Sequence, residues 1–181
     1  MGLAFVISLT VFVLEVIGGF LSGSLALLSD AGHVLADALA LGMSWFALRL
    51  AERPASAKAT FGYHRVGIMV ALINGTALCV MAALIFREAY PRFFSPPEIQ
   101  TTELLAIAAV GLVANLVMAK LLHAGHNHSL NVRSAWLHVL GDSLASVGVI
   151  IAGLVIRFTG WEYADPIISV LIGGLIFIGG V

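Results

Sequence analysis

The chain has 181 residues, of which 60% are hydrophobic and 10% are charged, and its mean hydropathy is +1.05. Soluble globular proteins carry about 25% charged residues, so this chain has too little charge to cover a water-facing surface. The net charge of −1 argues against a nucleic-acid-binding protein, and the single cysteine excludes a zinc cluster built from thiolates. The composition predicts an integral membrane protein.

Six stretches are apolar enough to cross a bilayer as helices, which takes roughly 20 residues each. The predicted helices cover residues 3–20, 25–48, 66–86, 104–119, 135–156 and 164–181. We therefore expect an all-α membrane protein with six transmembrane helices, all in one transmembrane domain, residues 1–181. Because the last apolar run reaches Val181 without a polar tail, we also expect that a following domain is missing from this chain.

The basic residues are unevenly divided among the connections between these helices. Six lie in or beside the connections after the second and fourth helices, and three lie in those after the third and fifth. Since cytoplasmic loops are enriched in lysine and arginine, the first two connections and both termini are predicted to be cytoplasmic. The six are Arg49, Arg53, Lys58, Arg65, Lys120 and Arg133, and the three are Arg87, Arg92 and Arg157.

Ionisable residues interrupt two of the apolar stretches. The second predicted helix carries Asp30, His33 and Asp37, and the fifth carries His138 and Asp142. Such residues cost at least about 2.5–3.5 kcal/mol each at the bilayer centre, so their presence needs a reason. Spacings of three and four residues place those of each helix on one face.

The two interrupted segments also resemble each other. Residues 33–40 and 138–145 are identical at six of eight positions, including the His and the Asp. Both segments lie inside their helices, so the two pairs can meet near the midplane. Two imidazoles and two carboxylates form a set of four N and O ligands that suits tetrahedral Zn²⁺, and the cation would neutralise both carboxylates.

Three other interpretations compete with a site for a transported metal. A single buried His–Asp pair is often only structural, but a second copy at matching depth argues against that. A pure proton relay does not need the second copy. A hydrolytic metal site lacks the His-Glu-x-x-His pattern of metalloproteases, and four protein ligands leave no position for a reactive water.

The energy source is inferred by exclusion. Neither lysine, Lys58 or Lys120, follows a glycine, so the chain has no Walker A loop, and no aspartate precedes a lysine as in a phosphorylated-aspartate motif. An ion gradient therefore remains as the energy source for transport. Histidine exchanges a proton near neutral pH and must be deprotonated to bind metal, so protons and metal ions would displace each other.

Several segments resemble the cation diffusion facilitator family of metal/proton antiporters. They are residues 23–33 leading to Asp37, Phe61-Gly62-Tyr63-His64-Arg65, His138-Val139-Leu140-Gly141-Asp142 and Ala164-Asp165-Pro166-Ile167. The resemblance implies a six-helix domain, a homodimer and a zinc-preferring transport site. The implied ligands are His33, Asp37, His138 and Asp142.

The chain departs from that family at three places. The cytoplasmic C-terminal domain that usually follows the sixth helix is expected to be missing from these 181 residues, and Met1 lies almost at the first helix, where many members have a polar tail. Gly67 occupies a position that is commonly acidic. These differences bear on regulation and dimer strength and leave the intramembrane site intact.

Other polar residues are secondary candidates. Asp30 is expected to relay protons or guide metal at the mouth of the site, or else to cap the second helix. His123, His126 and His128 either deliver metal from a cytoplasmic loop or belong to a plain polar linker. Glu15 is costly to bury and is a candidate for a cavity or proton role.

Two further positions are expected to be structural. Asn115 lies in an apolar run, where an asparagine typically hydrogen-bonds to another helix. Asp165 and Pro166 are expected to form the N-terminal cap and first turn of the sixth helix.

The sequence thus predicts a metal cation/proton antiporter, not an enzyme, that exports Zn²⁺ from the cytoplasm by alternating access. Alternatives are Cd²⁺, Co²⁺ or Fe²⁺ at the same site, a membrane-embedded metalloenzyme, and a passive channel without proton coupling. Zn²⁺ is expected as transported substrate without another cofactor, and the expected partners are divalent metal ions, protons, the lipid bilayer and a second copy of the chain. Compact loops favour a bacterial inner membrane as its location.

Overall fold

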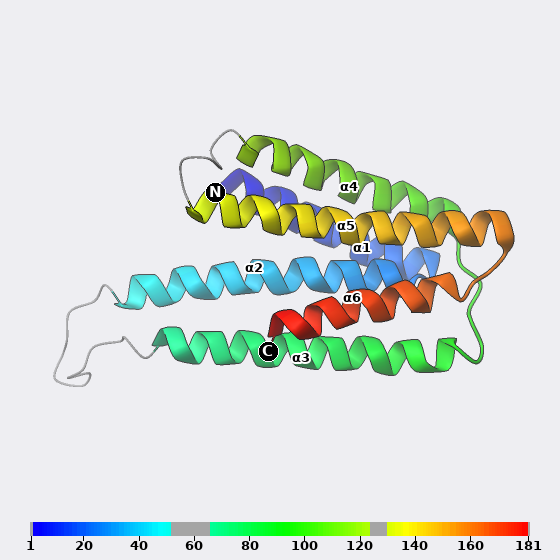
Figure 1. Cartoon of the computed structure of the whole chain (residues 1–181), viewed down its shortest axis with the longest axis horizontal. Helices are drawn as coiled ribbons and strands as arrows, with labels where there is room; N and C mark the ends of the chain where they lie inside the picture. The colour runs from blue at the N-terminus through cyan, green and yellow to red at the C-terminus, as the bar shows by residue number, and fades with distance from the viewer. Residues whose placement is uncertain (1, 52–65, 124–129, 181) are drawn as a thin grey trace.

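The computed structural model describes residues 2–51, 66–123 and 130–180, and the elements found there are α-helices (Figure 1). The helices are α1 (Gly2–Ser22), α2 (Leu25–Ala51), α3 (Val66–Arg92), α4 (Thr101–His123), α5 (Leu130–Thr159) and α6 (Ala164–Gly180). Each predicted apolar segment corresponds to one helix, so the expected all-α fold is confirmed.

Several helices run beyond the apolar segments that predict them, because polar residues continue the helix past the apolar stretch. α3 continues from residue 86, where its apolar segment ends, to Arg92 and carries Pro91 in its last turn. Within the described part of the chain, three stretches are both long and apolar enough to cross a membrane: Gly67–Arg92, Thr101–Leu121 and Val139–Thr159. Two shorter apolar helical stretches are Val6–Ser22 and Ala164–Gly180.

The six helices pack as a group of four with a pair beside it. α1 contacts α2 and α4, while α5 contacts α4 and α2, so α1 and α5 lie on a diagonal of the four-helix group. α3 packs along α6, and this pair is joined to the group through α2 and α5. α2 is therefore the helix of the group that contacts both α3 and α6.

The chain alternates direction from one helix to the next (Figure 1). The connections α1–α2, α3–α4 and α5–α6 lie together at one end of the molecule, at the right of the view. The N-terminus lies at the opposite end, and α6 runs toward that end. This arrangement agrees with an even number of crossings, and which end faces the cytoplasm stays a prediction.

Small residues fill the contacts between helices, and large apolar ones face outward. Ala26, Ala82, Ala108 and Ala152 are at most 1% exposed. Leucine, isoleucine and phenylalanine side chains on every helix are exposed, among them Phe20, Leu72 and Ile178. An apolar exterior with close contacts between small residues is what a bundle solvated by lipid requires.

A buried carboxylate joins the starts of α2 and α6. Asp165 accepts hydrogen bonds from Ser24 Oγ (2.5 Å), the Leu25 amide (2.8 Å) and the Ala26 amide (3.2 Å). The prediction that Asp165 caps α6 is wrong: α6 already begins at Ala164, and the carboxylate serves the unpaired amides of α2 instead. The prediction for Pro166 is confirmed, because it lies in the first turn of α6.

Arg92 brings the end of α3 to the same point. Its guanidinium donates to the Gly23 carbonyl oxygen (2.7 Å) and lies 3.7 Å from Asp165 Oδ2. Gly23 has a φ of +72°, a conformation that favours glycine, and this permits the tight turn between α1 and α2. We call Gly23, Ser24, Arg92 and Asp165 the polar clamp. It fastens three helices at one end of the bundle.

Candidate metal site

The register of α2 places two predicted ligands on its inner side. Ser24 Oγ accepts a hydrogen bond from the Leu27 amide (3.1 Å) and thereby caps the helix. His33 and Asp37 then lie one turn apart on one face, with His33 Nε2 3.6 Å from Asp37 Oδ2. The local sequence is thus sufficient to bring these two side chains together.

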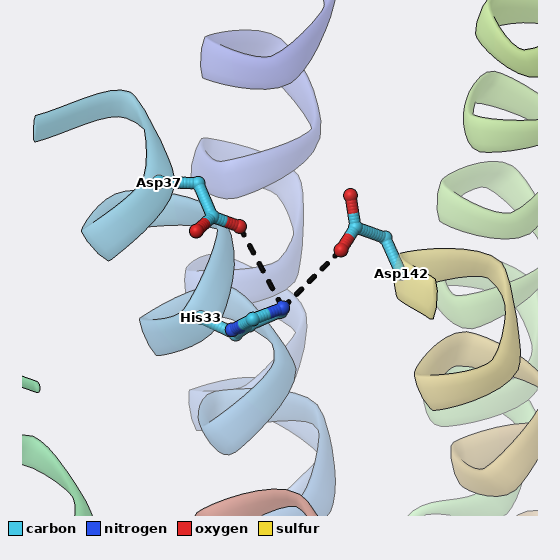
Figure 2. A group of neighbouring side chains, drawn as sticks. All are labelled: His33, Asp37 and Asp142. Carbon is cyan, nitrogen blue, oxygen red and sulfur yellow. Dashed lines mark hydrogen bonds and ion pairs between the residues drawn. The ribbon is translucent and has the colours of Figure 1, made fainter. Parts of the chain in front are cut away.

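A third predicted ligand comes from α5. Asp142 Oδ1 lies 3.2 Å from His33 Nε2, so one ring nitrogen faces carboxylates from two helices. Figure 2 shows the three side chains converging on the space between α2 and α5. In the described part of the chain, this is the group of three metal-ligating side chains whose ligand atoms all lie within 4.8 Å of one another.

The spacing of these atoms fits a small divalent cation. Two ligands bound to tetrahedral Zn²⁺ at about 2.0–2.1 Å are about 3.3 Å apart, and the two measured separations, 3.2 and 3.6 Å, bracket that value. The side chains of His33, Asp37 and Asp142 are 23%, 25% and 12% exposed, which leaves an approach for an ion. The donor set of one imidazole and two carboxylates matches zinc chemistry.

His138, the fourth predicted ligand, lies on α5 one turn before Asp142. Its side chain is outside the described residues, so its part in the site stays a prediction. His123 is the last residue of α4, and its side chain is likewise not described. His126 and His128 lie in the segment 124–129, outside the described residues, and metal delivery by this loop stays a prediction too.

Asp30 lies one turn from His33 but does not join the metal group. Its side chain is 2% exposed, and its Oδ2 accepts a hydrogen bond from Ser146 Oγ of α5 (3.1 Å). Since α2 begins at Leu25, Asp30 lies in the second turn, and the alternative that it caps the helix is wrong. Its role at the mouth of the site stays a prediction.

Asn115 extends this contact to a third helix. Its Nδ2 donates to Ser146 Oγ across a long separation of 3.5 Å, so the predicted interhelical hydrogen bond is confirmed. Ser146 is a residue that the sequence reasoning missed. The available signal was its position four residues after Asp142, which places both on one face of α5.

Comparison with known proteins gives relatives over nearly the whole chain. The family model of the cation efflux transmembrane domain matches residues 1–181. The zinc transporter ZitB of Escherichia coli (strain K12) is 48% identical over 174 residues, which are 96% of this chain and 56% of that protein.

Two further relatives are similar to the same extent. The cadmium, cobalt and zinc/H⁺-K⁺ antiporter of Bacillus subtilis (strain 168) is 44% identical over 180 residues, 98% of this chain and 58% of its own length. The metal cation efflux system protein CzcD of Cupriavidus metallidurans is 46% identical over 164 residues, 91% of this chain and 52% of its own length. The chain therefore spans somewhat more than half the length of these curated relatives. Because the family model covers it from end to end, the chain belongs to the cation efflux family of transmembrane domains.

Proposed function

We propose that this chain is the transmembrane domain of a secondary transporter that exports a divalent metal ion, with Zn²⁺ preferred, from the cytoplasm in exchange for protons. The observation that carries the proposal is the convergence of His33, Asp37 and Asp142 between α2 and α5. The names of two relatives, a zinc transporter and a cadmium, cobalt and zinc/H⁺-K⁺ antiporter, support the same class of activity.

The proposed ligand set is completed by His138. Its position one turn before Asp142 repeats the spacing of His33 and Asp37 on α2. Each helix would then supply one imidazole and one carboxylate, which satisfies the four-coordinate preference of zinc and leaves no open position for hydrolysis. This argues for binding and release of the ion and against a metalloenzyme.

Exchange for protons follows from the chemistry of the ligands. Imidazole and carboxylate bind metal only when deprotonated, so a rise in proton concentration on one side expels the ion there. Since histidine titrates near neutral pH, modest pH gradients are sufficient. For the whole protein, we further propose a homodimer, as the family resemblance implies. We also propose a bacterial inner membrane as its location, because the loops are compact.

The test is zinc flux into sealed proteoliposomes under an imposed pH gradient. Wild type is compared with Asp37→Asn and Asp142→Asn, and Glu103→Gln serves as control because Glu103 is an exposed carboxylate at the start of α4. We expect flux that follows the proton gradient and falls at least about tenfold in both site variants, with the control unchanged. Flux that survives either substitution, or that ignores the gradient, contradicts the proposal.

The same preparation separates the rival functions. Competition by Cd²⁺, Co²⁺ or Fe²⁺ ranks the ions at the site. A passive channel would carry zinc without moving protons. A metalloenzyme would turn over a lipid or peptide without net zinc transport.

A further inference from the structure

Glu15 of α1 is the ionisable residue that the proposed metal site leaves without an explanation. Its side chain is 1% exposed, and neither carboxylate oxygen has a hydrogen-bond partner among the residues that the structure describes. The ion pairs found in that part of the chain do not include it. An ionised carboxylate in such a position is so costly that it takes up a proton or binds a cation.

The carboxyl group lies against a polar layer formed by three other helices. α4 approaches it at Gly111, where an added Cβ would lie 2.6 Å from Glu15 Oε1. Asn115 lies one turn further along α4. It donates a hydrogen bond to Ser146 Oγ, which in turn donates to Asp30 Oδ2. Asp30 lies close enough for its negative charge to act on Glu15.

A proton fits this position better than a metal ion. The group of metal-ligating side chains in the described residues consists of His33, Asp37 and Asp142, and neither Glu15 nor Asp30 belongs to it. Ser146 donates a hydrogen bond to Asp30, whereas no donor among the described residues reaches the Glu15 carboxyl group. Of two carboxylic acids in one low-dielectric environment, the one without a hydrogen-bond donor retains its proton more readily.

We propose that Glu15 is a proton-binding site of the transport cycle, distinct from the metal ligands and neutral in the arrangement described here. The inference rests on the proposed function. The step is reversible: one carboxylate oxygen of Glu15 takes one proton from water and returns it to water. Packed against Gly111, the group stays protonated, and a glutamic acid that reaches water at neutral pH gives its proton up.

Electrostatics links this proton to the metal. The charges that act on Glu15 from neighbouring helices are those of Asp30 on α2 and Asp142 on α5, and α4 contacts it at Gly111. A divalent ion bound at Asp142 cancels negative charge near Glu15 and so favours its ionised form. Metal binding therefore promotes proton release from Glu15, and metal departure promotes proton uptake, which is the coupling that an antiporter needs.

The first experiment counts the protons that zinc displaces. Zinc is titrated into the purified protein in buffers of different ionisation enthalpy, which yields affinity and proton release together. For Glu15→Gln we expect about one proton fewer released per zinc ion. Because proton release and zinc binding favour each other, its zinc affinity should also be weaker by about tenfold. Glu103→Gln is the matched control, and Asp37→Asn should lose zinc binding itself. Equal proton release by wild type and Glu15→Gln overturns the inference while leaving the metal site standing.

The second experiment observes the proton directly. The infrared spectrum of metal-free wild-type protein at neutral pH should contain the carbonyl stretch of a protonated carboxyl group that is missing from Glu15→Gln. Should that variant not fold, Glu15→Asp keeps an acid at the position, and the band should shift. This result is independent of transport, so it remains decisive even where wild-type protein fails to move zinc. A spectrum without such a band overturns the inference.

Discussion

His33 is the side chain at which two helices meet. Its Nε2 atom lies 3.2 Å from a carboxylate oxygen of Asp142 and 3.6 Å from one of Asp37. The nitrogen is also the atom that distinguishes this group from an all-oxygen site. Since imidazole suits zinc and carboxylate suits harder ions, the identity of residue 33 should control ion preference.

Replacement of His33 by Asp is expected to change selectivity more than stability. The substitution leaves His138 as the single imidazole of the proposed set and adds a third carboxylate, which weakens Zn²⁺ binding and suits Mn²⁺ better, so the ratio of zinc to manganese affinity should fall about tenfold or more. Competition titrations with a metal indicator measure both affinities. An unchanged ratio would mean that His33 does not bind the metal, with Glu103→Gln as the control for unrelated effects.

The proximity of His33, Asp37 and Asp142 can be predicted from the sequence because the spacing is local, whereas their binding of metal stays a prediction. His33 and Asp37 share a helix face by a four-residue step, and the repeat around His138 and Asp142 indicates the partner helix. Ser146 was not predictable in the same way, since it contacts Asp30 across 116 positions of the chain and serine is common in membrane helices. Its partner appears only once the helices are packed.

At the scale of the element, the sequence predicts where helices lie better than how they end. The capping of α2 depends on Asp165, which is 141 positions away from Ser24 in the sequence. An aspartate before a proline indicates a local cap, and here the same carboxylate serves another helix. The pairing of α3 with α6 was equally hidden, because all six helices are apolar on their outer faces.

Loss of the Asp165 carboxylate should destabilise the junction of three helices. In Asp165→Ala the Leu25 and Ala26 amides lose a buried acceptor and the Arg92 guanidinium loses its ion-pair partner, which should lower the free energy of unfolding by about 2 kcal/mol. Thermal unfolding of the detergent-solubilised protein measures the change. Glu103→Ala, which removes an exposed carboxylate, should have little effect. Equal stability of the two variants would show that the polar clamp contributes nothing.

At the scale of the whole molecule, the arrangement places three of the connections at one end and the N-terminus at the other (Figure 1). The distribution of basic residues predicts that the N-terminal end faces the cytoplasm. On that orientation, the layer of Glu15 and Asp30 lies on the outward side of the metal group, because Asp30 precedes His33 on a helix that runs from the clamped end inward.

This orientation can be tested by labelling single cysteines in a Cys79→Ala background. Ser95→Cys lies in the connection after α3, where residue 95 is exposed, and Lys58→Cys lies in the predicted cytoplasmic connection. A membrane-impermeant thiol reagent should label only Ser95→Cys in intact cells and only Lys58→Cys in inverted vesicles. The reverse pattern would invert the assignment of both ends.

The polar clamp also determines how far residues at different positions along α2 move when the helix tilts. α2 has 27 residues and is about 40 Å long, and one of its ends is bonded to α3 and α6 through Arg92 and Asp165. A tilt of about 10° that leaves those bonds intact shifts His33 by about 2 Å and the far end of α2 by about 7 Å. His33 lies near the fixed end of α2. A small displacement of the metal ligands therefore accompanies a larger displacement at the far end of the helix.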